Sequence, residues 1–205
     1  RYKISMQHLE KKFWKRCKRT GDILEEYAYI LDILPQGRME EKAFKRVPIA
    51  LAIGEEEFKL FELIPKPGEA LAIGDRVYIG KDIEKRDKIG SVKRRISYEE
   101  LTPAAQSELE FVVMQIVQRN EKRFVTFFNE AQPVTTRLHQ LDLLYGVGKS
   151  LMWEILDERK KGPFNSFQDL KSRVKGLRDP ERMITERILR ELKNKEERHR
   201  LFVSS

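Results

Sequence analysis

The chain has 205 residues, 40% hydrophobic and 36% charged, with a net charge of +8 at pH 7. This length allows one or two packed domains, and the mixture of both charge signs excludes a disordered composition. The single cysteine, Cys17, excludes an internal disulfide framework and suits a reducing cytoplasm, and no apolar run is long enough to span a membrane. We therefore expect a cytoplasmic protein without membrane contact. Lysine and arginine are concentrated at both ends of the chain, which indicates a polyanionic partner.

Residues 1–21 are the first predicted element, a basic helix or arm. Apolar residues three or four positions apart, such as Leu9 and Phe13, alternate with a run of lysines and arginines. Such an arm can lie along phosphates, and a solvated extension is the equal alternative.

Residues 22–96 are predicted to form a small β-barrel. Short apolar segments, separated by glycine or proline, predict five strands at residues 26–34, 48–53, 58–64, 76–79 and 89–96. No helical pattern lies between them, so a barrel is favoured over a parallel sheet, with a small open sheet as the competitor. The pattern Gly-Asp-x-Val-x-Ile from Gly74 to Ile79 resembles an OB or S1-like barrel. The resemblance implies that one barrel face binds oligonucleotides.

Basic residues are predicted to gather along one rim of this barrel. One of them lies in the long loop after the first strand, and the others belong to the dense basic stretch of residues 80–95. If that stretch links two strands, its cations form a track for phosphates, whereas local charge pairing in a solvated hairpin is the alternative. The predicted rim residues are Arg38, Lys81, Arg86, Lys88, Lys93, Arg94 and Arg95.

Residues 97–133 are predicted to be linker helices between the barrel and the C-terminal part. Ser97 and Glu100 match a Ser-x-x-Glu capping box, and Pro103 suits the first position of a second helix. The apolar stripe that follows predicts packing against the barrel. The aromatic segment 124–128 is expected to be buried at the interface between the two halves.

Residues 134–205 carry the strongest functional signal. Leucines at helical spacing, in a helix that Thr135 or Thr136 is expected to cap, precede a glycine-flanked turn and an amphipathic helix. Both glycines allow a tight turn, and the first N–H groups of the second helix lack partners at the positive end of its dipole. This arrangement suits a phosphate oxygen. The predicted phosphate contacts are Gly146, Val147, Gly148, Lys149 and Ser150.

The glycine-flanked hairpin resembles the helix-hairpin-helix motif, which grips the nucleic-acid backbone without reading sequence. Met152 stands where the motif has a small residue, so we expect looser helix packing. A weaker second copy follows, in which Ser166 caps one helix, Pro180 begins the next, and Lys175 and Arg178 supply charge. An ordinary helical hairpin is the alternative. The predicted fold class is therefore α+β with two domains, an OB/S1-like barrel followed by an all-α tandem helix-hairpin-helix domain, and the tail after Asn194 is expected to fray.

Longer stretches also resemble an uncharacterised archaeal family, the domain of unknown function 655. The similar segments are PKPG, GDRVYIGK, RDKIGSVKRRISYEELTP and the GVG hairpin followed by GPFxSFxDL, and the resemblance covers about residues 24–192. It implies a nucleic-acid-binding protein but no established reaction.

The sequence predicts a non-enzymatic binder of RNA or DNA, with RNA slightly favoured, and no metal or cofactor. The three histidines are scattered without metal-ligand spacing, and no P-loop is present. One alternative is a scaffold that binds a protein partner through its helical hairpins. Another is a DNA-repair glycosylase-like enzyme, since Asp169 lies downstream of Gly148, although helix capping already accounts for that aspartate.

Overall fold

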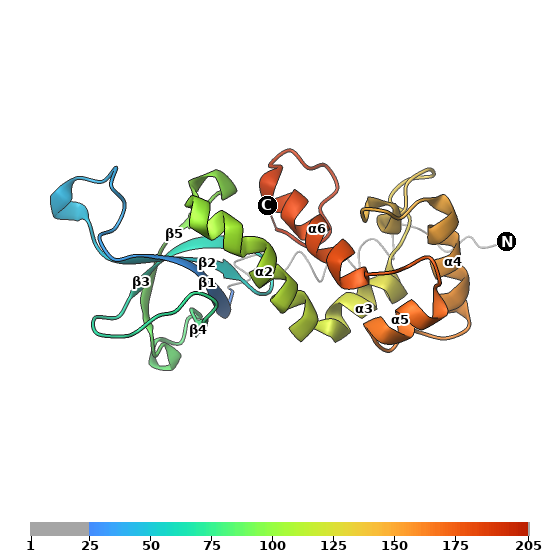
Figure 1. Cartoon of the computed structure of the whole chain (residues 1–205), viewed down its shortest axis with the longest axis horizontal. Helices are drawn as coiled ribbons and strands as arrows, with labels where there is room; N and C mark the ends of the chain where they lie inside the picture. The colour runs from blue at the N-terminus through green and yellow to red at the C-terminus, as the bar shows by residue number, and fades with distance from the viewer. Residues whose placement is uncertain (1–24, 205) are drawn as a thin grey trace.

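The structure is a computed structural model that describes residues 25–204, so the predicted basic arm and Cys17 lie outside the described residues. The chain forms a curled antiparallel sheet followed by helices (Figure 1). This confirms the predicted α+β class at the level of a β half-barrel joined to a helical part.

All five predicted strands are present. They are β1 (Tyr27–Leu34), β2 (Ile49–Gly54), β3 (Leu60–Pro65), β4 (Arg76–Tyr78) and β5 (Ile89–Ile96). Neighbouring strands pair antiparallel in the order β4-β1-β2-β3-β5. Because β4 and β5 are the two edges and are not paired with each other, the sheet is a half-barrel and not the closed barrel that the strand pattern predicted. Short 3-10 helices, η1 (Ala43–Lys45) and η2 (Ile83–Lys85), lie in the β1–β2 and β4–β5 loops.

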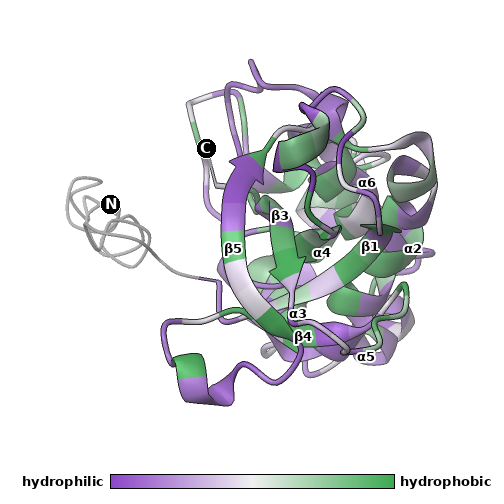
Figure 2. Ribbon diagram, turned by 90° about the vertical axis from the view of Figure 1, so that its left-hand side faces the viewer, coloured by the Kyte–Doolittle hydropathy of each residue, from purple (hydrophilic) through white to green (hydrophobic). Residues whose placement is uncertain are grey.

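Both faces of the sheet are buried. Alternation along β1 places Tyr29 and Leu31 in the cluster that includes the helices, whereas Ala28 and Ile30 join a smaller cluster on the opposite face. Tyr29 is therefore a core residue, and its hydroxyl accepts a hydrogen bond from Arg119 at 3.0 Å. The hydrophilic C-terminal half of β5 lies at the sheet edge (Figure 2).

The helical part contains η3 (Tyr98–Glu100), α2 (Pro103–Arg119), α3 (Glu121–Glu130), η4 (Gln140–Leu143), α4 (Lys149–Lys160), α5 (Phe167–Arg173) and α6 (Pro180–Lys193). The predicted capping box is present at η3, and Thr102 caps α2. The aromatic segment 124–128 belongs to α3, where Phe124 and Phe128 are fully buried as expected. One continuous apolar cluster extends from the sheet through α2 and α3 into the hairpins.

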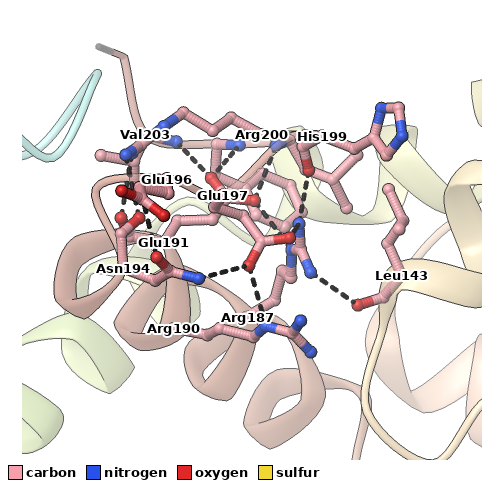
Figure 3. Close-up of polar contacts among 12 residues, drawn as sticks. Leu143, Arg187, Arg190, Glu191, Asn194, Glu196, Glu197, His199, Arg200 and Val203 are labelled. Carbon is pink, nitrogen blue, oxygen red and sulfur yellow. Dashed lines mark hydrogen bonds and ion pairs between the residues drawn. The ribbon is translucent and has the colours of Figure 1, made fainter.

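The residues after α6 do not fray as predicted, because a buried ion pair holds them in place (Figure 3). We call residues 195–204 the C-terminal strap. The Glu191 carboxylate accepts a hydrogen bond from Arg187 at 2.8 Å and from three strap N–H groups, those of residues 201–203. Arg187 also donates to the Leu143 carbonyl at 3.3 Å and to the strap at the His199 carbonyl. The strap is thus tied to α6 and to the segment before the glycine-flanked turn.

Candidate nucleic-acid interface

The Gly146–Gly148 turn joins η4 to α4 and is fixed by two features. Gly146 has a φ of +80°, a conformation that side-chain-bearing residues rarely adopt. Val147 is buried, and its N–H donates to the Leu144 carbonyl at 3.2 Å. Val147 therefore anchors the turn in the core, and its N–H is occupied, contrary to its predicted role as a phosphate contact.

The N-terminus of α4 is open to solvent. Gly148 is the N-cap and has no side chain to cap the helix, and the first hydrogen bond to its carbonyl comes from Met152 at 2.9 Å. The N–H groups of Lys149, Ser150 and Leu151 meet no acceptor within residues 25–204. A Cβ placed on Gly148 would find no atom within 4 Å. An anion can therefore approach these three N–H groups directly.

Other helices of this part begin differently. The side chains of Thr102, Ser166 and Asp179 cap α2, α5 and α6, respectively. In each case an oxygen of the protein satisfies an N–H group that α4 leaves exposed. The uncapped start of α4 therefore differs from the starts of α2, α5 and α6, whereas α3 also begins, at Asn120, without a side-chain cap.

The turn of the second hairpin has the same hydrogen bond as the first turn, but the helix that follows it is capped. The N–H of Leu177 donates to the Val174 carbonyl at 3.1 Å, as Val147 does to Leu144. However, Asp179 accepts the Arg182 N–H at 3.1 Å and places a carboxylate at the start of α6. A Cβ on Gly176 would approach Leu151 to 2.9 Å, so this glycine serves helix packing. With a carboxylate at the start of α6, this hairpin offers a ligand positive charge in place of an open helix start.

That charge comes from Lys175 and Arg178, both of which are exposed. The N–H of Lys175 is bound by Glu154 at 2.9 Å, which leaves its ammonium group as the part that a ligand could reach.

Lys149 is held beside the open helix start. Its ammonium donates to the Arg137 carbonyl at 2.9 Å and to Asp142 at 2.5 Å, yet the side chain is 60% exposed. Burial would raise the pKa of Asp142, but hydrogen bonds from Lys149 and from the His139 N–H outweigh it and lower that pKa. The Asp142 carboxylate therefore stays ionised, positions the lysine and offsets part of its charge.

The segment before the turn is not the full helix that the leucine spacing predicted. Instead, η4 spans one short turn, and His139 and Asp142 cap it. Thr135 does not cap a helix, because its hydroxyl accepts the Arg137 and Leu138 N–H groups at 3.2 and 3.0 Å and closes a local turn. Burial and the charge of Arg159 lower the pKa of His139, whose Nδ1 accepts a hydrogen bond within this cap.

Two exposed aromatic residues lie near the open helix start, and neither was identified from the sequence as a candidate site residue. Tyr145 is 76% exposed in the turn, and Trp153 is 57% exposed in α4, one helical turn after Lys149. The apolar stripe of α4 passes through Met152 and Ile155, so Trp153 falls outside it. A large aromatic residue outside the apolar stripe of a helix is expected to be exposed, and this pattern in the sequence could have identified Trp153.

The predicted rim cations are engaged within the protein. Glu62 on β3 is fully buried and accepts hydrogen bonds from Arg38 at 2.7 Å and Arg94 at 2.9 Å, and Lys93 lies 3.8 Å away. Lys93 also pairs with Glu41 at 2.5 Å. These cations offset buried or neighbouring carboxylates, as in the local-pairing alternative.

The remaining rim residues are also mostly occupied. Arg86 donates to the carbonyls of residues 79, 80 and 90, Lys88 pairs with Asp75 at 3.1 Å, and Arg95 donates to the Ser204 carbonyl at 2.9 Å. Lys81 is exposed. The rim therefore does not present a row of available charges, and it lies at the opposite end of the molecule from α4 (Figure 1).

Residues 25–204 contain no cluster of three histidine, cysteine or acidic residues that could hold a metal. No helix within this range is both long and apolar enough to cross a membrane. Asp169, the residue behind the glycosylase alternative, accepts the Asn165 N–H at 3.0 Å and pairs with Arg173 at 3.3 Å. Its contacts stabilise the first turn of α5.

Comparisons with known proteins place this architecture among archaeal relatives. A family model described as "Protein of unknown function (DUF655)" matches residues 24–204. "Uncharacterized protein MJ0038" from Methanocaldococcus jannaschii is 48% identical over 187 residues, which are 91% of this chain and 83% of that protein. The crystal structure of Af1531 from Archaeoglobus fulgidus superposes with a TM-score of 0.80 at 47% identity, covering 88% of this chain and 100% of the other.

Proposed function

The chain belongs to this family of unknown function, DUF655, and we propose that it is a non-enzymatic protein that binds the phosphate backbone of nucleic acid at the start of α4. The observation that carries the proposal is the set of three N–H groups, those of Lys149, Ser150 and Leu151, that meet no acceptor within residues 25–204 behind the glycine-flanked turn. These donors point out of the positive end of a helix dipole, where an anion is stabilised.

The open space at the turn can accommodate a group as large as a phosphate. Gly148 has open space where another residue would carry a side chain, so a bulky tetrahedral anion can reach the backbone. Lys149 supplies a cation at the same place. Contacts of this kind fix a nucleic acid through its backbone and carry no sequence information, so binding should be independent of sequence.

The wider interface in this proposal is a tandem helix-hairpin-helix domain spanning residues 134–205. The first hairpin supplies hydrogen-bond donors, and the second contributes the positive charges of Lys175 and Arg178. The half-barrel, which the structure describes from residue 25 to residue 96, is proposed to be an OB/S1-like module. RNA is favoured slightly over DNA on that analogy, which concerns the fold and not a site.

Salt dependence of binding tests the proposal. Fluorescence anisotropy of the full chain with single- and double-stranded RNA and DNA should show log affinity falling linearly with log salt, by about 0.7 to 0.9 per phosphate contact. Absence of binding to every probe, or affinity that ignores salt, would refute it. That result would favour the alternative in which the helical hairpins bind a protein partner.

A further inference from the structure

The loop between β1 and β2, residues 35–48, presents an exposed apolar tip. Phe44 is 79% exposed and Met39 is 70% exposed, which makes Phe44 the most exposed large hydrophobic residue of the described chain. The loop projects from the end of the molecule opposite α4 (Figure 1). We refer to it as the β1–β2 loop.

The β1–β2 loop is held in one conformation by its own contacts. Gly37 has a φ of +69°, and a Cβ there would lie 2.7 Å from the Val47 carbonyl oxygen, so the two ends of the loop pack closely. Arg46 turns inward and donates to the carbonyls of Glu41 at 3.0 Å and Met39 at 2.9 Å. The Arg46 guanidinium is therefore bound by carbonyls of the loop itself, while the Phe44 ring remains in water.

The same loop is fixed to the sheet. Glu41 pairs with Lys93 at 2.5 Å, and Arg38 pairs with the buried Glu62 at 2.7 Å. A loop that is already ordered loses little conformational freedom when a partner binds. The backbone that carries Phe44 is thus fixed to the sheet before any ligand arrives.

The charges around Phe44 favour an anionic partner. Lys42 and Lys45 are exposed and pair with no carboxylate within residues 25–204, and the Lys45 ammonium lies 6.0 Å from the centroid of the Phe44 ring. Because Glu41 is neutralised by Lys93, Glu40 is the remaining acid of the loop. The tip therefore combines an accessible aromatic face with net positive charge.

We propose that the β1–β2 loop binds an unpaired nucleotide, whose base stacks on Phe44 and whose flanking phosphates contact Lys42 and Lys45. Aromatic side chains beside cations bind single strands in this way, because every base offers a face for stacking. Bases inside a duplex are already stacked on each other and cannot use the loop. The inference shares the nucleic-acid ligand of the proposed function but rests on different residues, and it adds single-stranded segments as a class of ligand.

The test compares a short oligouridylate with a blunt RNA duplex, using anisotropy and the full chain. Phe44→Ala should weaken oligouridylate binding by about 5- to 150-fold and leave duplex binding unchanged. Phe44→Trp, which keeps an aromatic face, should bind the oligonucleotide at least as well as the unmodified protein. Phe111→Ala is the matched control, because Phe111 is 67% exposed on α2, away from the loop.

Three results would overturn the inference. The first is no oligouridylate binding by the unmodified protein, and the second is unchanged affinity after Phe44→Ala. The third is an equal loss in Phe44→Ala and Phe111→Ala. Binding to phosphatidylserine vesicles that depends on Phe44, without an effect on the oligonucleotide, would assign the loop to a membrane surface and also overturn it.

A Gly148→Asp variant separates this inference from the site at α4. If that variant loses duplex binding while Phe44→Ala selectively weakens oligouridylate binding, both contacts are supported. If only the Phe44 effect is seen, the loop stands and the α4 proposal fails. If only the Gly148 effect is seen, the loop inference fails alone.

Discussion

Replacement of Gly148 by aspartate would turn the open start of α4 into a capped one. The backbone at this residue, with φ −86° and ψ 177°, suits any amino acid, and the space for a Cβ is empty. The new carboxylate can accept the Ser150 or Leu151 N–H, as Asp179 accepts the Arg182 N–H in α6. The variant thus fills the proposed phosphate position with an oxygen of the protein itself.

The expected effects on stability and binding have opposite signs. Aspartate in place of glycine at an N-cap stabilises a helix by a few tenths of a kcal/mol, and its charge adds about 0.3 to 1 kcal/mol through the dipole. The Tm should therefore stay constant or rise. Each lost hydrogen bond to a phosphate is worth about 1.5 to 3 kcal/mol, so affinity should fall by at least about tenfold. The salt slope should decrease by about 0.7 to 0.9.

Anisotropy at several salt concentrations, together with thermal unfolding of the same samples, measures both effects. Ala104→Asp is the control, because it adds one negative charge at an exposed position near the start of α2. Unchanged affinity in Gly148→Asp, or an equal loss in Ala104→Asp, would refute the phosphate site. A clear fall in the Tm of Gly148→Asp would refute the open-cap geometry.

Further predictions concern stability. Glu191→Gln leaves the buried Arg187 without its main counter-charge, so the free energy of unfolding should fall by about 3 to 5 kcal/mol in denaturant titrations; a loss below about 1 kcal/mol would contradict this. His139 has a pKa below its ordinary value of 6.5, so stability should decline as pH falls from about 6.5 toward the lowered pKa, and His139→Asn should remove that decline. Arg38→Met should lower the Tm because it removes one partner of the buried Glu62, and duplex affinity should not change; loss of binding at unchanged Tm would restore the rim as a contact.

Local signals in the sequence predicted the elements well. Alternating apolar residues ended by glycine or proline indicate strands, and all five were found. Helix-start signals, such as the cap Ser166 and the first helical residue Pro180, depend on neighbours only a few residues away, and these predictions are correct for the same reason. The helix expected before the turn was wrong, because the turn closed by the Thr135 hydroxyl overrides the helical spacing of the leucines.

Long-range pairing set the limit of what the sequence could predict. From the sequence alone, the basic stretch around Arg94 is predicted to be available for phosphates. In the structure, β3 places the buried Glu62 beside it, and Glu62 pairs with Arg94. The charged tail is predicted to fray from its sequence alone, but in the structure its N–H groups donate hydrogen bonds to Glu191. At the candidate site, the sequence identified Gly146 and Gly148 as a turn. Which N–H groups of that turn are already hydrogen-bonded depends on the three-dimensional fold, as the bond from Val147 to Leu144 shows.

The C-terminal strap has a practical consequence for experiments that divide the chain. It runs from α6 back to the sheet, where the Ser204 N–H donates to the Glu57 carbonyl at 3.2 Å and the Ser204 carbonyl accepts from Arg95. Phe202 also packs edge-on against the rings of Phe124 and Phe127. Fragments cut between the sheet and the hairpins would each expose apolar surface that the intact chain covers. Loss of binding by such a fragment would then report misfolding, so single-residue variants of the undivided chain are the sounder probes.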